Sequence, residues 1–411
     1  MISENYIVDI DYSLLQVMEH FNTFIRNPKR IDNLILIHKY CYDTWKNGSK
    51  YLHFYTLHNQ EHAVSLIHSS IEILHSISYF QIKPIDYYVL FAACYLHDIS
   101  MVTLPEINKF AMEESNGVNN IVDGFCNSIS DNNKLNRVDL KMQLVKVYED
   151  MDEYYESIVR DEHARNSASE IRKHSELDFL DETMRDLIAG VSEAHGFDTN
   201  DVYNVRSRGK DTLTNEKFIK ILLRLSDLLD ISRYRISNVV LYHNLKNLNE
   251  VSRFHWISHL ITKGYRLETV YRSESDRNSG DISENLHSRI ANKAIIEKLI
   301  INVEVLMSQT TEIENTPNCK NVSGFISNKD EDLKIKILFN QEKCEEKCSF
   351  LCRWFMKKNE YLINELVSLK NYLNMLDDNF FQCEIEVHVD VVQDTNISNE
   401  VFDYLRDFIE K

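Results

Sequence analysis

Apolar residues recur along the first half of the chain with the period of an amphipathic helix. Glycine and proline, which interrupt helices, number only 9 and 4 in the whole sequence. The pattern predicts helices over residues 31–45, 58–79, 85–97, 140–155, 162–173, 182–194 and 215–231. Between them, the polar stretches ESNGVNNIVDG and ISDNNKLN, within residues 114–136, predict a surface loop.

The pattern changes after residue 235. Segments that alternate in polarity or are rich in β-branched residues predict strands over residues 237–242, 265–272, 333–339 and 383–392. Helical patterns lie over residues 283–310, 341–376 and 399–409. The sequence therefore predicts a mainly α protein: a helical bundle over residues 1–235, then a smaller α+β domain with a short antiparallel sheet over residues 236–411. We expect the second domain to regulate the first, to form oligomers or to cover the substrate.

The charge of the chain changes which partners are expected. Its 411 residues include 64 acidic and 46 basic side chains, for a formal net charge of −18. The average field repels polyanions, so nucleic acid is an unlikely partner, whereas a small anion can still bind beside a few arginines and a metal ion. The longest apolar run, YYVLFAACYL, is too short to span a bilayer, and the first residues lack a basic and apolar signal segment. We expect a cytoplasmic protein without a membrane anchor.

Histidine and aspartate residues stand in strongly apolar surroundings. In LHNQEHAVSLI, His58 and His62 are four residues apart, which places both on one face of the predicted helix. His97 and Asp98 end the apolar helix LFAACYLHDIS, and Asp227 lies among leucines in ILLRLSDLLDISRYR. An unpaired carboxylate there would cost several kcal/mol. A divalent cation would supply the missing partner, and these ligand types suit Mn²⁺, Fe²⁺, Zn²⁺ or Co²⁺, or Mg²⁺ with added water.

A histidine, then a His-Asp doublet, then a distant aspartate on a leucine-rich helix resembles the signature of the HD superfamily of metal-dependent phosphohydrolases. The signature is carried by His62, His97, Asp98 and Asp227, within about residues 30–240. The segments RDEHARNSA and SEAHG are most similar to the HD-CE subgroup, which is often met in bacterial defence and signalling proteins.

The resemblance implies an HD-type helical bundle and one or two divalent ions. It assigns the first ion to His62, His97, Asp98 and Asp227, with Asp98 bridging to a second ion where one is present. His163 and His195 fall where the histidines of the second site are expected. We expect Asp227 to be a ligand and Asp230, at the helix end, to stand apart, so that Asp230→Asn keeps most activity.

The sequence leaves open whether His58 is a metal ligand or a proton donor. HNQEHA is similar to the HNxxHA of class I cyclic-nucleotide phosphodiesterases, in which the first histidine gives a proton to the leaving oxygen. Leu57 replaces the tyrosine usual before that motif, and the glutamine that reads the base is not located, so only the histidine roles are carried over. His58, or His163 if it is not a ligand, is the expected proton donor, and Asp98 acts with it.

Arginines flank the motifs, and guanidinium forks suit phosphate oxygens. The expected substrate contacts are Arg160, Arg165, Arg224, Arg233 and Arg235, although each could instead pair with an acidic side chain. His255, Trp256 and His259, in SRFHWISHL, could line a base pocket, but a plug between the two domains is favoured.

These features predict a metal-dependent phosphohydrolase of a small nucleotide. Deoxynucleoside triphosphates are the first substrate class to test. The alternatives are a hydrolase of cyclic nucleotides or guanosine polyphosphates, a single-strand nuclease, which the charge disfavours, and a regulatory module that binds a nucleotide or a partner protein without turnover. A homo-oligomer stays possible.

Overall fold

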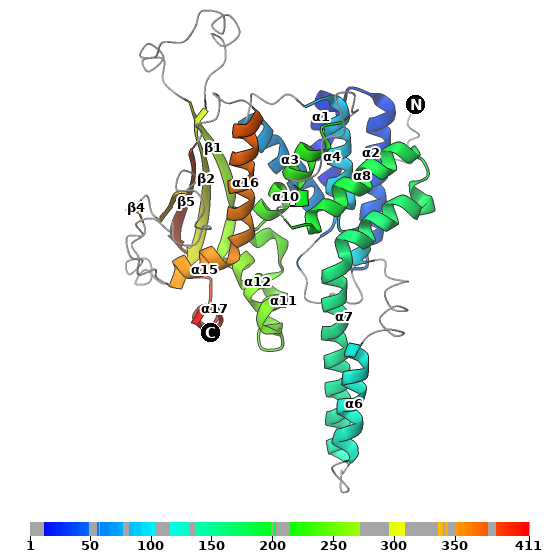
Figure 1. Ribbon diagram of the computed structural model, residues 1–411. Coiled ribbons are helices and arrows are strands. Elements are labelled where there is room, and N and C mark those ends of the chain that lie inside the picture. The colour runs from blue at the N-terminus through cyan, green and yellow to red at the C-terminus, as the bar shows by residue number, and fades with distance from the viewer. Residues whose placement is uncertain are drawn as a thin grey trace, which may run out of the picture.

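The computed structural model of the chain (Figure 1) describes residues 12–48, 56, 58–76, 82–102, 116–130, 137–198, 201–202, 214–271, 296–308, 336–339, 342–343, 350–376 and 384–410. Helices form a bundle on one side, and a sheet with its own helices lies on the other. The mainly helical fold with a small sheet is confirmed.

The bundle begins with α1 (Tyr12–His20), a π-turn (Phe21–Ile25), α2 (Pro28–Trp45), α3 (Gln60–Ser76) and α4 (Pro84–Leu96). Almost every side chain of α4 is buried, because α2, α3, α8 (Glu182–Glu193) and α10 (Glu216–Leu229) all contact it. A helix that is apolar all round is stable only in such a central position. A short 3₁₀ turn (Ile99–Met101) follows α4, so the end of the central helix carries the His-Asp doublet.

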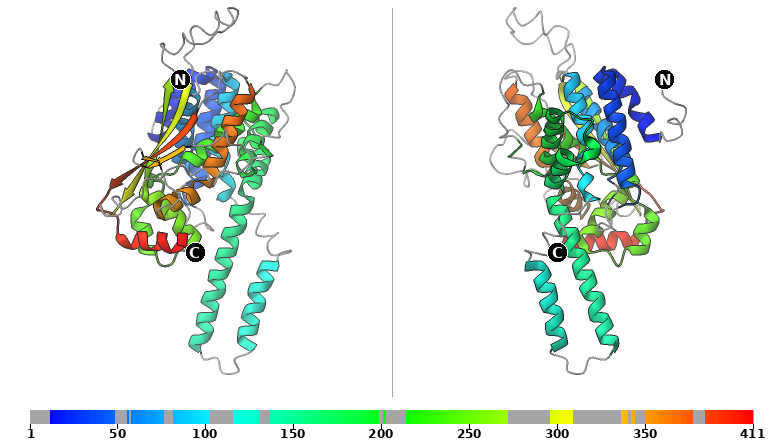
Figure 2. Two further views of the ribbon diagram at one scale, coloured as in Figure 1. Left: turned by 60° about the vertical axis from the view of Figure 1, so that its left-hand side comes forward. Right: turned by 90° about the vertical axis from the view of Figure 1, so that its right-hand side faces the viewer.

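Two long antiparallel helices project from the bundle (Figure 2), namely α6 (Asn116–Ser130) and α7 (Arg137–Lys173). The expectation of a surface loop is therefore wrong for residues 116–130, which form α6; residues 131–136 lie outside the described residues. The two helices expected at 140–155 and 162–173 are one continuous helix. Short 3₁₀ turns, Ser175–Leu177 and Ala194–Gly196, flank α8 on either side.

The sheet has the strand order β1-β2-β5-β3-β4, formed by β1 (Thr262–Tyr271), β2 (Ile296–Met307), β3 (Lys336–Phe339), β4 (Glu342–Lys343) and β5 (Glu384–Gln393). β1–β2 and β3–β4 are antiparallel, whereas β5 runs parallel to both β2 and β3. The sheet is thus mixed, and the antiparallel expectation holds for its two edge pairs. Parallel pairing is possible because the chain between β3 and β5 includes α15 (Phe350–Lys358) and α16 (Glu360–Leu376), long enough for a crossover.

Besides β4 (Glu342–Lys343), which lies within the helix expected over residues 341–376, two segments took the other type of secondary structure. Residues 237–242 were expected as a strand, but Ser237 caps α11 (Asn238–Asn244) by accepting a hydrogen bond from the Val240 N–H. Residues 296–307, within an expected helix, form β2 instead, with Ile301, Val303 and Val305 buried and the residues between them less so. Tertiary context decided both cases, since short apolar runs fit either period. The rest of that expected helix, residues 283–295 and 309–310, lies outside the described residues.

The sheet side and the bundle contact each other. After the turn Arg233–Arg235, α11 and α12 (Glu250–Ile261) lead into β1, and α17 (Asn399–Glu410) packs on α12. α16 lies against α10 (Figure 1). There Arg224 and Glu365 form a buried ion pair. The division at residue 235 stays a prediction. None of the helices in the described part of the chain combines the length and hydropathy needed to cross a bilayer.

Candidate metal centre

The first candidate ligand, His62, lies in the first turn of α3. The helix begins at Gln60 because the Asn59 side chain accepts hydrogen bonds from the N–H groups of Glu61 (3.1 Å) and His62 (3.4 Å). His58 therefore lies before the helix, and the expectation that it shares a helical face with His62 is wrong. The side chain of His58 still lies beside that of His62, with the ring centroids 5.1 Å apart.

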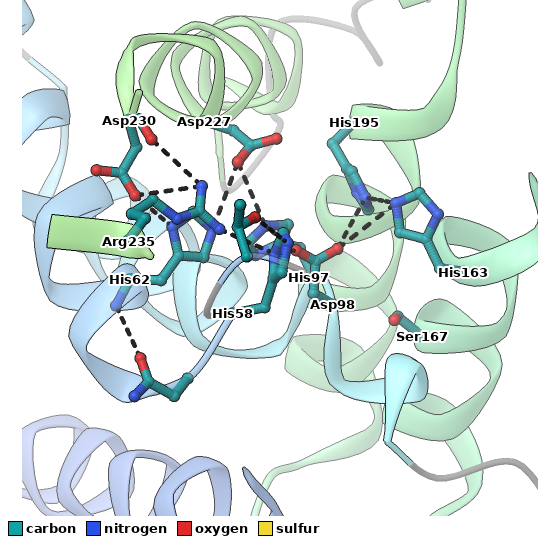
Figure 3. Close-up of polar contacts among 12 residues, drawn as sticks. His58, His62, His97, Asp98, His163, Ser167, His195, Asp227, Asp230 and Arg235 are labelled. Atoms are coloured by element: carbon teal, nitrogen blue, oxygen red, sulfur yellow. Dashed lines mark hydrogen bonds and ion pairs between the residues drawn. The ribbon is translucent and has the colours of Figure 1, made fainter. Parts of the chain in front are cut away.

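The Asp98 carboxylate lies between two groups of histidines (Figure 3). Its Oδ2 atom is 2.7 Å from His58 Nδ1 and 2.9 Å from His97 Nε2. Its Oδ1 atom is 3.2 Å from His195 Nε2 and 3.5 Å from His163 Nε2. One carboxylate thus faces both sides, which is the geometry of a bridging ligand.

The histidines on the Oδ1 side face each other. His163, from α7, and His195, from the turn after α8, have their Nε2 atoms 2.7 Å apart. Their Nδ1 atoms each lie 2.5 Å from a backbone carbonyl oxygen, of Arg160 and Ser192. A carbonyl only accepts, so both Nδ1 atoms carry the proton and both Nε2 atoms are turned toward Asp98. Where both Nε2 atoms carry a lone pair, the two would repel at this distance, and a cation beside them would remove the repulsion.

The Oδ2 side has the same arrangement. His97 Nδ1 lies 3.1 Å from the Cys94 carbonyl oxygen, and His62 Nδ1 lies 2.5 Å from Asp230 Oδ2. Asp227 Oδ1 faces the other ends of these rings, 3.4 Å from His62 Nε2 and 3.9 Å from His97 Nε2. The Nε2 atoms of His62 and His97 are buried and face carboxylate oxygens, those of Asp227 and, for His97, of Asp98 as well. Ring nitrogens that are oriented and left without a donor are typical of metal ligands.

Asp230 corrects one expectation. Although it caps the end of α10 as expected, its carboxylate is buried rather than apart from the site. Besides His62, it accepts a hydrogen bond from the Ser65 hydroxyl at 2.6 Å and lies 3.5 Å from Arg235 Nη1. Asp230 thus contacts the ring of His62, and we now expect its replacement to affect the centre.

The carboxylates give the centre a strong preference for positive charge. Burial by itself lowers the pKa of His97, but Asp98 and Asp227 outweigh it and raise that pKa to about 9. Burial raises the pKa of Asp98, yet His97 and His58 hold it well below its usual value. In the metal-free chain His97 therefore carries a proton, which a bound metal cation would displace.

Two ion positions fit these residues. His62, His97 and Asp227 form one group, and Asp98, His163 and His195 form another, each with ligand atoms within 4.8 Å of one another. Imidazole nitrogen and carboxylate oxygen together suit divalent transition metals and, with water, Mg²⁺. A third combination, His58 with His62 and Asp98, is also close enough, so geometry alone leaves His58 as either ligand or proton donor.

The five candidate arginines have different surroundings. Arg235 Nη2 lies 3.2 Å from His58 Nδ1, which puts this guanidinium beside the centre (Figure 3). Arg160 pairs with Glu156 at 3.1 Å and lines the adjoining cavity. Arg165 is exposed beside Glu162, and Arg233 pairs with Asp394.

Arg224 has partners other than phosphate. Its Nε and Nη2 donate to the Glu365 carboxylate, each at 3.0 Å, and its Nη1 donates to the carbonyls of Ala194, His195 and Phe197. It is buried, so its role is to hold the turn that carries His195.

A cavity of about 320 Å³ adjoins the centre. His58, Asp227 and Arg235 line it from the bundle, and His255, Trp256 and His259 line it from α12. The expectation that the α12 residues plug a domain interface is therefore incomplete, because they also form a wall of this cavity. Lys358, at the end of α15, also lines it. Lys358 could not be predicted as a site residue, because nothing in its local sequence relates it to the ligands.

A family model described as HD-CE matches residues 52–299, which include all seven histidines and aspartates of the centre. No curated protein and no solved structure gives a match to the chain.

Proposed function

The chain belongs to the HD-CE family, and from this premise we propose that it is a metal-dependent phosphohydrolase of a small nucleotide, with deoxynucleoside triphosphates as the first substrates to test. The proposal rests on the position of the Asp98 carboxylate, which lies between two sets of inward-facing imidazole nitrogens. The cavity beside it falls within the volume range of small-molecule sites. The intact ligand set disfavours a regulatory module without turnover.

The two ion positions match what phosphoryl transfer requires. Bound divalent cations would supply an activated water and neutralise charge on the phosphoryl group that is attacked. Asp98 would be a ligand of both ions, and Asp230 and the backbone carbonyls orient the histidines.

His58 is proposed as the proton donor to the leaving oxygen. It lies between Asp98 and Arg235, and its Nε2 is 3.3 Å from the Thr56 hydroxyl at the cavity wall. Burial, with Arg235 adding to it, lowers the pKa of His58 to about 3, so the ring is neutral at pH 7. The ring can give a proton to the leaving oxygen only as an imidazolium, so it would first have to take up the proton that the attacking water releases. Arg235 is placed to contact the phosphate from the same side.

The test is product analysis with matched variants. The full chain is incubated with Mn²⁺ or Mg²⁺ and a panel of deoxynucleotides, ribonucleotides, cyclic nucleotides, guanosine polyphosphates and a labelled oligonucleotide, and the products are separated by chromatography. We expect mononucleotide hydrolysis that a chelator abolishes and added metal restores. Hydrolysis of no member of the panel would contradict the proposal.

The same experiment checks the metal ligands. The double variant His97→Ala, Asp98→Ala should lose bound transition metal, measured by elemental analysis, and lose turnover, while its circular dichroism stays helical. His243→Ala, a surface histidine on α11, is the control and should behave as the wild type. Full metal stoichiometry in the double variant would show that the ion binds elsewhere.

A further inference from the structure

The cavity beside the metal centre is closed by residues beyond the part of the chain that matches the family. Its bundle side carries Asp227 and Arg235, and its far side carries Lys358 from the end of α15. The family match ends at residue 299, so Lys358 lies beyond it, as do Asn359, Tyr361 and Leu362, whereas the other lining residues lie within it.

Lys358 is a cation paired with a neutral group. Its ammonium lies 3.0 Å from Nδ1 of His255, which can only accept this hydrogen bond in its neutral form. Burial, together with Lys358 and Arg160, lowers the pKa of His255 to about 3, so the imidazole stays neutral. In the part of the chain that the structure describes, no carboxylate forms an ion pair with Lys358.

The other cations of the cavity have acidic partners in the protein. Arg160 pairs with Glu156 at 3.1 Å, and Arg235 lies 3.5 Å from Asp230. Lys358 differs from both, although it is only partly exposed. Burial and Arg235 lower the pKa of Lys358 to about 8, and the smaller opposing effect of Asp227 offsets its charge only in part. A partly buried cation without a counter-ion favours binding of an anion.

We propose that Lys358, with Arg235, binds a second phosphate of the substrate, so that the segment after the HD-type part selects a nucleoside di- or triphosphate. This proposal rests on the proposed function of the metal centre. One phosphoryl group would lie at the Asp227 end of the cavity, and the next would lie against Lys358.

The cavity walls agree with this substrate class. Leu228, Ile231 and Leu362 line the same space and give it an apolar wall, which suits a sugar or base better than further phosphates. A cyclic monophosphate has one phosphate and would leave Lys358 without a partner. A molecule with a phosphoanhydride fills both the metal end and the lysine end.

The proposal is tested by calorimetric titration of the full chain with inorganic pyrophosphate and with orthophosphate. Each titration is done in Mg²⁺ and again with a chelator. We expect Lys358→Ala to weaken pyrophosphate binding on the order of tenfold or more, since a hydrogen bond to a charged group is lost. Lys358→Arg should keep most of the affinity. Orthophosphate, which fits at the metal end alone, should bind both proteins alike in Mg²⁺.

Lys357→Ala is the matched control, because Lys357 is exposed and its ammonium lies over the Phe408 ring, 4.8 Å from the centroid. It should bind pyrophosphate as the wild type does. Lys358→Met keeps the apolar stem of the side chain and replaces the alanine variant if that variant does not fold, as judged by circular dichroism.

The outcomes separate the two proposals. Equal pyrophosphate affinity in the wild type and Lys358→Ala, or no binding by the wild type at millimolar concentration, would overturn the role of Lys358 even if nucleotides are hydrolysed. Binding that depends on Lys358 without hydrolysis of any nucleotide would support the phosphate site and refute the proposed enzyme.

Discussion

His62 is held at both ends of its ring. Asp230 lies 2.5 Å from Nδ1, and Asp227 lies 3.4 Å from Nε2. The two aspartates are three residues apart at the end of α10, so one helix end provides both a candidate ligand and the group that orients a second ligand. The centre therefore includes a residue that orients a candidate ligand without being one itself.

Asp230→Asn tests this at the level of one residue. Loss of the partner of a ligating histidine typically weakens metal affinity by about 10–100-fold, so we expect a loss of that size for Asp230→Asn and a larger one for Asp227→Asn. Competitive metal titration measures both, with the exposed Asp403→Asn as control. Unchanged affinity in Asp230→Asn would show that His62 keeps its orientation without this contact.

The sequence reveals ligands more readily than the residues that position them. His97, Asp98 and Asp227 are visible because a polar side chain in an apolar helix needs a partner. The partnership of His62 with Asp230 spans 168 positions, and no local pattern encodes it. The same reason hides Lys358, which becomes relevant only when α15 packs beside α12 and the cavity forms.

At the scale of elements, α10 and α16 are joined by one buried ion pair. Arg224 binds the Glu365 carboxylate through two hydrogen bonds, each of 3.0 Å, and Glu365 is fully buried. Pairs of this geometry are specific, and loss of one partner leaves a buried charge uncompensated. This contact fixes the helix that carries Asp227 against the helix that follows Lys358.

Glu365→Ala should lower the free energy of unfolding by about 3–5 kcal/mol. Glu360→Ala, at an exposed position of the same helix, should lower it far less. Urea denaturation followed by circular dichroism compares the two variants. Similar losses would mean that the pair contributes no more than an exposed side chain does.

Helices of the bundle were predictable because their apolar stripes repeat over several turns, as in α3, α8 and α10. Shorter or uniformly apolar segments were not. In β2 the residues IINVEV fit a strand and a helix equally, and pairing with β1 and β5 decides between them. In α6, weak helix formers such as asparagine and glycine concealed a helix that packing against α7 stabilises.

For the whole molecule, an acidic chain with a few cations concentrated in one cavity suits a small anion. The net charge of −18 repels a long polyanion, whereas Arg160, Arg235 and Lys358 lie together beside the metal centre. Such enclosed contacts are screened weakly by salt.

We therefore expect mononucleotide hydrolysis to change little between roughly 50 and 200 mM salt, whereas a protein that neutralises several phosphates would lose orders of magnitude in affinity. Initial rates at subsaturating substrate, measured over this range, provide the comparison. Efficient and strongly salt-sensitive cleavage of single-stranded DNA or RNA, absent in His97→Ala, would favour a nuclease instead.

The candidate ligands come from segments that are far apart in the chain: the residues before α3, α3 itself, the end of α4, α7, the turn after α8, and α10. An ion bound there would act as a non-covalent cross-link that exists only in the folded chain. By mass action, free metal at about one hundred times its dissociation constant would add about 2.7 kcal/mol to the free energy of unfolding. The melting temperature would then rise and fall with the supply of the ion, and metal starvation would leave the chain not only inactive but also more readily degraded.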